Sequence, residues 1–284
     1  MYAELRILIV SIFILGCSGK TSNSEDSVNE NPTAIVSENY IYLSHTRLDT
    51  NDGVYSKIYD INFDDFDMTL LGGDLAEESF ENNDITAHLN AVFDLTNKNT
   101  LWSIGNHDRT TDQRFREVTN KNKYHFRKKN DIAFITLDSQ DSLSSIVGAQ
   151  KEFLFGVLDT VSSKSIVVLS HKLIFMNEHP FMDPLINTVC NGKKGDCYYC
   201  HNDNNFQSEI YPKFLDAKNR GIDIYFIGGD LGYKTSTFEY IDTNDITFLG
   251  NGIWYLNEDN QVLLLNNTNG LLTYNFAPID TLIN

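Results

Sequence analysis

The chain has 284 residues, of which 41% are hydrophobic, and it carries a formal net charge of −17. A field of that sign repels nucleic-acid backbones, which argues against a nucleic-acid binder that works through a basic surface. Once a leader and a tether are set aside, the length suits one α/β domain with a sizeable core. No second domain is evident, and no internal repeat beyond a doubled Gly-Gly-Asp-Leu.

The N-terminal region predicts an exported, lipidated protein. Residues 7–15 form an apolar run that is too short to span a bilayer but suits the core of a signal peptide, which we place at residues 1–16. The next residue, Cys17, lies in a sequence that resembles a bacterial lipoprotein processing site, where it would become the lipidated first residue. Residues 17–37 are polar and predict a flexible tether. The folded domain, 38–284, is therefore expected in the bacterial cell envelope, anchored to the membrane through Cys17 and facing the periplasm or the cell surface. A buried N-terminal strand is the alternative.

Hydrophobic periodicity predicts an α/β fold for the rest of the chain. Helical spacing or composition predicts helices over residues 78–95, 146–161 and 207–220, and a short helix over 55–62. Strands separated by turns are predicted over residues 131–137, 235–241, 245–250, 261–266 and 270–276.

Five further apolar runs end in side chains of the types that bind metals or move protons. They end at His45, at Asp74, in the segment Gly105–Asp108, at His171 and at Asp230. Short continuous apolar runs are typical of strands buried on both faces, and in α/β sheets the ligand lies beyond the carboxyl ends of the strands. We therefore expect these five ends to meet at one crevice, the candidate active site.

The order of these motifs resembles the calcineurin-like metallophosphoesterases. Gly72–Asp74 is followed by Gly105–Asp108 and by a strand ending in His171, and Leu137–Ser139 resembles a further stretch of that family. The resemblance covers roughly residues 38–255. It implies a four-layer α/β/β/α sandwich of two mixed sheets flanked by helices, in which the strand-rich C-terminal third suits the second sheet. It also implies a hydrolase of phosphomonoesters or phosphodiesters that uses a metal-activated hydroxide.

The same resemblance implies roles for single residues. Asp74 matches the carboxylate that bridges two metal ions, and Asn106 and His171 match ligands of one of those ions. His107 matches the residue that contacts the phosphate or protonates the leaving group, and Asp108 would orient His107 from behind. Carboxylate, amide and imidazole ligands suit a divalent ion such as Mn, Fe or Zn.

The first and last motifs depart from the family's pattern. The family has Asp-x-His where this chain has His45 and Arg47, and Gly-His-x-His where it has Asp230 and Gly232. Both lost ligands, at Arg47 and Gly232, belong to the same metal site, so we predict one firmly bound ion and a second site that is weak or absent, with His45 as its remaining ligand. The predicted ligands of the firm site are Asp74, Asn106, His171 and Asp230.

Cationic side chains near these motifs would offset the negative field of the chain. They are Arg47, Arg109, Lys172 and Lys234. Arg47, together with Lys234, is expected to place positive charge where the second ion would have been, because a guanidinium can grip two phosphoryl oxygens. Scattered, solvated cations are the alternative.

A segment without clear periodicity, residues 172–206, contains Cys190, Cys197 and Cys200. Long loops that emerge beside a ligand are usually functional, so we expect a lid or a substrate-selecting loop. A structural disulfide suits an oxidising envelope compartment. The alternatives are a small metal clip on the three cysteines and, because Cys197, Cys200 and His201 match the attachment pattern of c-type haem, a haem.

The predicted function is that of a membrane-anchored, metal-dependent phosphoesterase. The altered motifs leave open a catalytically silent protein of the same fold that binds a glycan, a lipid headgroup or a protein partner. The adjacent pair Asn106 and His107 argues against that alternative, because a scaffold has no evident need for a costly polar cluster. A disulfide-stapled extracellular binding domain without metal would require every strand-end match to be accidental.

Overall fold

The computed structural model describes residues 37–49 and 53–283, all of which belong to one unit of the chain, Ile35–Asn284. The predicted signal peptide, Cys17 and the tether up to residue 36 lie outside the described residues. Among the described residues, no helix is long and apolar enough to cross a membrane.

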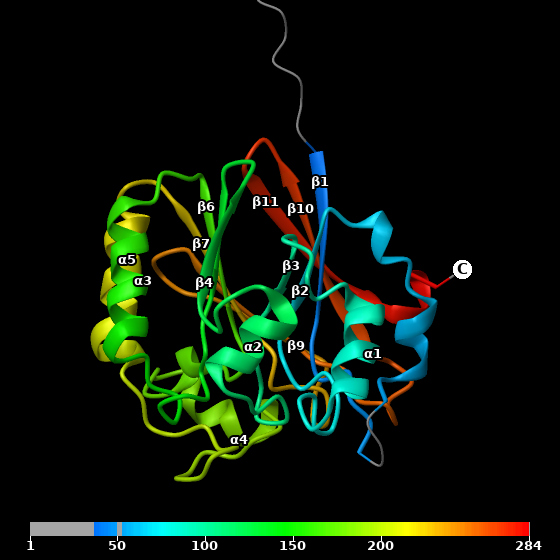
Figure 1. The fold of residues 1–284 in the computed structure, drawn as a ribbon. Helices are drawn as coiled ribbons and strands as arrows, with labels where there is room; N and C mark the ends of the chain where they lie inside the picture. The colour runs from blue at the N-terminus through cyan, green and yellow to red at the C-terminus, as the bar shows by residue number, and fades with distance from the viewer. Residues whose placement is uncertain (1–36, 50–52, 284) are drawn as a thin grey trace, which may run out of the picture. The chain divides into compact units, whose positions relative to one another are not determined.

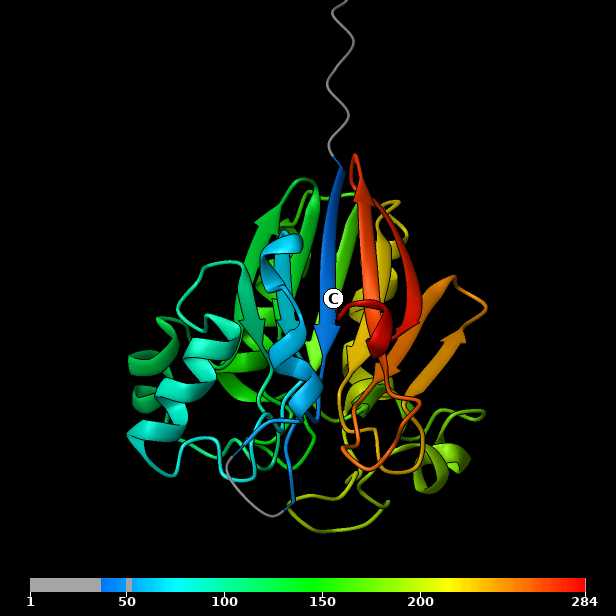
Figure 2. The same ribbon diagram turned by 90° about the vertical axis from the view of Figure 1, so that its right-hand side faces the viewer.

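The first sheet is mixed, with the strand order β11-β10-β1-β2-β3. Its strands are β1 (Ser37–Leu43), β2 (Met68–Leu71), β3 (Thr100–Trp102), β10 (Gln261–Thr268) and β11 (Leu271–Pro278). β1, β2 and β3 are parallel, so their carboxyl ends lie at the same edge, whereas β10 runs antiparallel to β1 with Leu264 opposite Ile41. Figure 2 shows β10 and β11, in orange-red, beside the blue strand β1.

The second sheet is also mixed, with the order β4-β5-β6-β7-β9-β8. Its strands are β4 (His125–Lys129), β5 (Ile132–Thr136), β6 (Ser165–Ser170), β7 (Asp223–Gly228), β8 (Thr237–Ile241) and β9 (Ile246–Asn251). The four inner strands β5, β6, β7 and β9 are parallel, and β4 and β8 run antiparallel at the two edges. The carboxyl ends of β6 and β7 therefore lie together, as those of β1, β2 and β3 do in the first sheet.

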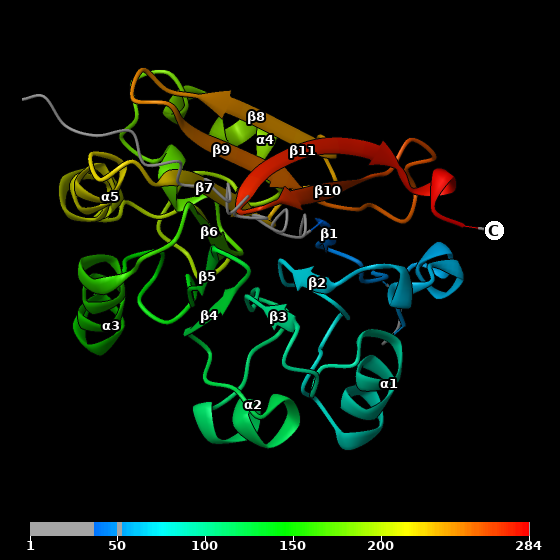
Figure 3. The same ribbon diagram turned by 90° about the horizontal axis from the view of Figure 1, so that it is seen from above.

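Helices cover the outer faces of both sheets. The α-helices are α1 (Asn83–Phe93), α2 (Asp112–Thr119), α3 (Gly148–Thr160), α4 (Ile186–Val189) and α5 (Tyr211–Lys218). Single turns are η1 (Ser56–Asp60), η2 (Phe63–Asp65), η3 (Ile174–Met176), η4 (Asp183–Leu185), η5 (Phe206–Ile210) and η6 (Ile279–Thr281). α3 and α5 lie outside the second sheet and α1 lies outside the first, as Figures 1 and 3 show from two directions.

Apolar clusters fill the spaces between these layers. Side chains of β1, β2, β5 and β6, with Tyr40, Leu70, Phe134 and Val167 among them, pack between the two sheets. Alternate residues of β5 and β6, such as Ile135 and Val168, pack outward against α3 and α5. The outward face of the first sheet packs against α1. This confirms the predicted four-layer α/β/β/α sandwich of two mixed sheets flanked by helices.

Several predicted elements differ from the observed ones. The C-terminal strands divide between the sheets, because β8 and β9 extend the second sheet while β10 and β11 join β1 in the first. The predicted helix over residues 78–95 begins only at Asn83, because the Asn82 side chain accepts hydrogen bonds from the backbone N–H groups of Asp84 and Ile85. Helix α2 and strand β4 are additional elements.

Candidate functional site

The five predicted strand ends meet where the carboxyl ends of the two sheets come together. The loops after β1, β2 and β7 touch directly, since the Ser44 hydroxyl donates to the carbonyl oxygens of Gly229, at 2.8 Å, and Gly73, at 3.1 Å. A methyl group added at Gly229 would lie 2.2 Å from the Gly72 carbonyl oxygen, so only glycine allows this approach. The two sheets therefore bring their loop residues to one place.

A cavity of about 170 Å³ opens at this junction. Its lining residues are His45, Arg47, Asp74, Asn106, His107, Asn191, Gly192, Tyr199 and Asp230. His171 lies directly behind it, fully buried. The structure thus brings together all the predicted metal ligands and two of the predicted catalytic residues, His107 and Arg47. Asn191, Gly192 and Tyr199 are additional and come from the segment 172–206.

Two buried residues of the site have left-handed backbone conformations. His45 has φ 54° and Asp74 has φ 55°, and both are nearly fully buried. For a non-glycine residue such a conformation costs about 1–3 kcal/mol and is held only where the surroundings fix it. Asp74 is fixed on two sides, since its carboxylate accepts a hydrogen bond from the His107 backbone N–H at 2.9 Å and its own backbone N–H donates to Asp108 Oδ2 at 2.6 Å. The backbone is therefore strained at Asp74, the residue whose carboxylate the sequence predicts at the centre of the site.

The side chains at the centre are separated by more than hydrogen-bond distances. His171 Nε2 lies 3.5 Å from Asp74 Oδ2 and 3.9 Å from Asp230 Oδ1, and His45 Nε2 lies 3.9 Å from Asp74 Oδ2. His171 Nε2 is buried without a hydrogen-bond partner among the described residues. Leaving a buried polar atom unpaired is costly. This nitrogen and the two carboxylates therefore face a point that suits an additional polar or charged group.

The histidines are oriented by backbone carbonyl groups. The Nδ1 atoms of His45, His107 and His171 lie 3.0, 2.8 and 2.7 Å from the carbonyl oxygens of Ile253, Glu77 and Gly72. A carbonyl oxygen only accepts, so each Nδ1 carries the proton and donates it. In the neutral rings the Nε2 atoms then have free lone pairs, which is the arrangement of histidines that bind metals.

The electrostatics of the site are those of buried imidazoles beside buried carboxylates. Burial lowers the pKa of His45. Burial alone would also lower the pKa of His171, but the carboxylates of Asp74 and Asp230 outweigh it and raise this pKa above its usual value. Burial opposes ionisation of Asp74 as well, yet the imidazoles of His171, His107 and His45 together hold its pKa below its usual value. The two carboxylates make the centre of the site attractive to a cation.

This donor set fits a divalent ion, although it is not already closed around one point. In residues 37–49 and 53–283, no three His, Cys, Asp or Glu side chains are gathered as a ready-made metal site. Two ligands about 2.1 Å from one ion in tetrahedral arrangement are separated by roughly 3.4 Å, which the 3.5 Å between Asp74 and His171 matches. The unpaired His171 nitrogen and the free Asp230 Oδ1 complete a set that Asn106 can join.

Asp108 occupies a different place from the one expected. Instead of orienting the His107 ring, its buried carboxylate accepts hydrogen bonds from the backbone N–H groups of Asp74 at 2.6 Å, Gly105 at 2.8 Å and Leu75 at 3.2 Å. It also accepts a short bond from the Ser79 hydroxyl. The His107 ring is oriented by Glu77, whose carboxylate lies 3.6 Å from Nδ1 besides its carbonyl contact. Asp108 is therefore a clamp between the loops after β2 and β3.

Of the four predicted cations, only Arg47 lines the cavity. Its Nη1 is bound to Glu77 and, at 2.8 Å, to Asp49, so part of its charge is already neutralised. Lys234 does not reach the place expected for the second ion, because its Nζ donates to the Cys190 carbonyl oxygen at 2.6 Å.

The remaining two cations also contact residues 190–202, which we call the cysteine segment. The Arg109 guanidinium stacks over the Tyr198 ring, 4.5 Å from its centroid. The buried Lys172 Nζ donates to the Tyr198 carbonyl oxygen at 2.9 Å and to Asn202 Oδ1 at 3.1 Å. Arg109, Lys172 and Lys234 thus hold the cysteine segment against the site.

The cysteine segment contains a disulfide and contributes residues to the site. Cys197 and Cys200 form a disulfide, while Cys190 is a free, buried thiol. His201 is not poised for haem, since its Nε2 donates to Asp230 Oδ2 at 2.8 Å. The Gly192 N–H donates to the same oxygen at 3.2 Å. These bonds fix Asp230 with its other oxygen toward His171, and the His201 bond helps to hold the pKa of Asp230 below its usual value although burial opposes ionisation.

Sequence reasoning missed Glu77, Asn191, Tyr199 and the contact between His201 and Asp230. The sequence indicated His201 only as part of the haem pattern. The available signal for a role at the site was a polar ring in an aperiodic segment that follows the predicted ligand His171. Glu77, three residues after Asp74, gave no signal of its own.

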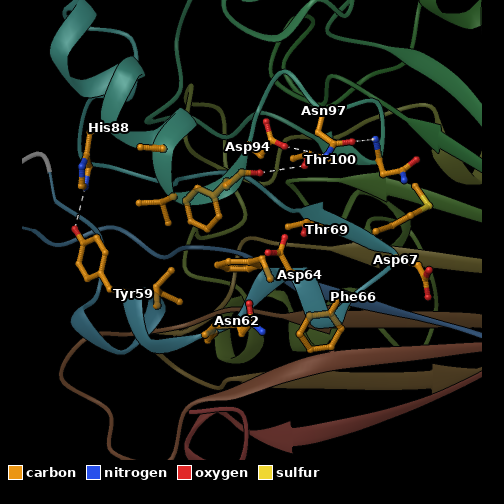
Figure 4. Close-up of a pocket in the computed structure, with 18 residues that line it drawn as sticks. Tyr59, Asn62, Asp64, Phe66, Asp67, Thr69, His88, Asp94, Asn97 and Thr100 are labelled. Carbon is orange, nitrogen blue, oxygen red and sulfur yellow. Dashed lines mark hydrogen bonds between the residues drawn. The ribbon is translucent and has the colours of Figure 1, made fainter. Parts of the chain in front are cut away.

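A larger cavity, of about 610 Å³, lies elsewhere, between η1 and α1 (Figure 4). Asp64, Asp67 and Asp94 line it, together with the hydrogen-bonded pair Tyr59 and His88 at 2.9 Å. No Lys or Arg is among its lining residues. Three carboxylates in a lining without Lys or Arg disfavour a phosphate group there, although Lys129 Nζ lies 4.0 Å from Asp67 Oδ1 outside the lining.

The sequence matches no protein-family model and no curated protein. The structure is similar to those of a dimetal phosphatase from Danio rerio (11% identity, 85% of this chain and 99% of that one, TM-score 0.47) and an uncharacterised, predicted phosphoesterase from Streptococcus pneumoniae (10%, 88% and 95%, 0.41). It is also similar to NAD nucleotidase from Haemophilus influenzae (12%, 87% and 50%, 0.43), of which it spans half the length. At these identities and TM-scores the likeness identifies no activity, so the function is argued from the site itself.

Proposed function

We propose that the chain is a metal-dependent hydrolase of phosphomonoesters or phosphodiesters, with one divalent ion held by Asp74, Asn106, His171 and Asp230. The observation that carries the proposal is the buried, unpaired Nε2 of His171, which faces the carboxylates of Asp74 and Asp230 beside a cavity large enough for a phosphate group. The motif resemblance supports the same reaction class.

When bound, a divalent ion such as Mn, Fe or Zn supplies charge neutralisation and an activated water nucleophile. His107 lies at the cavity with its Nδ1 proton donated to the Glu77 carbonyl oxygen and its Nε2 free. Nε2 can carry a proton to the leaving oxygen, and the nearby Glu77 carboxylate supports the charged ring. Arg47 also lines the cavity, where its guanidinium is paired with the carboxylates of Asp49 and Glu77. From there it can bind and orient a phosphoryl oxygen.

The proposal includes an envelope location with a lipid anchor at Cys17. The apolar run 7–15 and the disulfide between Cys197 and Cys200 support it, since disulfides persist in oxidising compartments. Metabolic labelling with a radioactive fatty acid tests the anchor. Label on the natural chain and none on Cys17→Ser is expected, and an unlabelled natural chain would refute it.

The function is tested by metal analysis of the purified chain together with hydrolysis of generic phosphomonoesters and phosphodiesters in the presence of Mn. We expect about one ion per chain, and turnover that is lost in Asp74→Asn and His107→Ala but kept in His88→Ala, whose exposed ring lies at the other cavity. Two fully occupied ions would refute the single-ion site. A bound ion without any turnover would favour the silent binding protein, and neither ion nor turnover would refute the hydrolase.

A further inference from the structure

Three large aromatic side chains lie at the candidate site or beside its lining residues. We call Tyr199, Tyr233 and Trp254 the aromatic rim. Tyr199 lines the cavity and is 54% exposed, and Tyr233 is 63% exposed. The Tyr233 ring packs edge-on against Trp254 with centroids 5.2 Å apart, and Trp254 lies 6.2 Å from the ring of His45, which lines the cavity. The rim therefore borders the site directly.

Two adjacent residues, Asn191 and Gly192, line the cavity and contact the backbones of Tyr233 and Tyr199. Asn191 lines the cavity, and its side chain accepts a hydrogen bond from the Tyr233 N–H at 2.9 Å and donates to the Leu231 carbonyl oxygen at 2.7 Å. The next residue, Gly192, approaches the Tyr199 backbone so closely that an added methyl group would lie 2.4 Å from its carbonyl oxygen. The two tyrosines of the rim are thus held by residues that line the cavity.

The size of the cavity decides where the rest of a substrate must lie. A volume of about 170 Å³ holds a phosphate group and little more, since drug-sized ligands need pockets of roughly 300–1,000 Å³. The organic part of an ester must therefore extend past the mouth and contact the rim. Single exposed apolar residues are ordinary, but exposed aromatic rings gathered at one polar cavity are typical of binding surfaces.

We propose that the organic part of the substrate carries a planar aromatic ring that stacks on the aromatic rim. This inference rests on the proposed phosphoesterase function and adds the substrate class. The rings of Tyr233 and Trp254 contact each other at 79°, and a substrate ring can add to this pair in the offset or T-shaped geometry that aromatic groups favour. Nucleobase and simple aryl esters share this chemistry, whereas an aliphatic ester has no face to stack.

Equilibrium binding of inorganic phosphate, glycerol phosphate, phenyl phosphate and a purine nucleoside monophosphate tests the proposal without requiring turnover. Tryptophan fluorescence gives a readout, because Trp102 is buried against Phe80 and Trp254 is the partly exposed indole. We expect the two ring-bearing esters to bind roughly tenfold more tightly than glycerol phosphate. Tyr233→Leu should reduce that ratio toward one while leaving inorganic phosphate unaffected.

The matched control is Tyr59→Leu, which removes an exposed tyrosine at the larger cavity and should leave the ratio unchanged. Tyr199→Leu provides a second rim variant should Tyr233→Leu fold poorly. Phosphate and glycerol phosphate binding without a preference for rings, or a preference that survives both rim variants, would overturn this inference and leave the phosphoesterase intact. Absence of any phosphate binding would overturn the proposed function and this inference with it. A preference for only one ring-bearing ester identifies the source of the ring and supports the stacking.

Discussion

Asp108 offers the sharpest test of how the site is held together. Its carboxylate, fully buried, accepts hydrogen bonds from the backbone of Asp74, Leu75 and Gly105 and from the Ser79 hydroxyl. Asp108→Ala would leave these donors without their acceptor, and each unpaired buried donor costs about 1–3 kcal/mol. Because water can enter the space left by the carboxylate, we expect a total loss of about 4 kcal/mol in the free energy of unfolding.

Asp108→Asn should cost less, about 2 kcal/mol, since one oxygen remains to accept while the new amide group faces a backbone donor. In a domain of this size 1 kcal/mol corresponds to about 2–4 °C in Tm, so the alanine variant should melt roughly 8–16 °C below the natural chain. Urea and thermal unfolding followed by circular dichroism measure both losses. The control Asp216→Ala removes an exposed carboxylate on α5 and should stay within about 0.5 kcal/mol.

The outcome separates two roles for Asp108. A loss of stability in both variants supports a clamp between the loops after β2 and β3. An Asp108→Asn protein that unfolds like the natural chain, but hydrolyses esters with an altered pH profile, would refute the clamp and restore the role implied by the family resemblance, orientation of His107.

Three further results are expected. His201→Ala should weaken Mn binding about 10- to 100-fold and His201→Gln, which keeps a donor for Asp230, should weaken it less; equal metal affinities in a titration would contradict a positioning role. Replacing Cys197 and Cys200 by serine should lower the free energy of unfolding in urea by about 2 kcal/mol, the value for so short a closed loop, and an unchanged midpoint would contradict it. Burial lowers the pKa of His125 to about 4, so between pH 6.5 and 4 this ring is protonated in the unfolded chain but neutral in the folded chain. The free energy of unfolding should therefore fall by up to about 3 kcal/mol as the pH drops through that window. If this free energy depends on pH identically in the natural chain and in His125→Asn, the prediction is wrong.

The parts of the fold that could be predicted are those with strong local signals. The buried parallel strands β1, β2, β6 and β7 appear as continuous apolar runs, and α3 is rich in apolar residues, of which Leu154 and Leu158 are buried at helical spacing. Helix α2 buries only Phe115 and Thr119 among eight residues, and β4 is an edge strand, His125–Lys129, in which partly buried and exposed residues alternate. Such segments bury too little apolar surface for their pattern to stand out.

Pairing between distant strands leaves no trace in a single sequence. β10 joins the first sheet because Leu264 pairs with Ile41, far away along the chain, and nothing in the local pattern of residues 261–268 distinguishes that partner from the second sheet. The same holds for the cysteine segment. The position of this segment depends on Arg109, Lys172 and Lys234, which contact it from three separate loops. The sequence could therefore indicate a functional loop without showing where that loop lies.

The carboxylate at position 230 explains how one residue contacts both the candidate site and the cysteine segment. An imidazole whose Nδ1 is held by the backbone has one nitrogen left, which could face His171 or the cysteine segment but not both. The carboxylate of Asp230 has two oxygens, of which Oδ2 receives His201 and Gly192 while Oδ1 stays directed at His171. Asp230 is thus the point at which the cysteine segment is joined to the site. A carboxylate at position 230 thus lets one side chain face the candidate site and hold the cysteine segment at the same time, and an imidazole held by the backbone could do only one of the two.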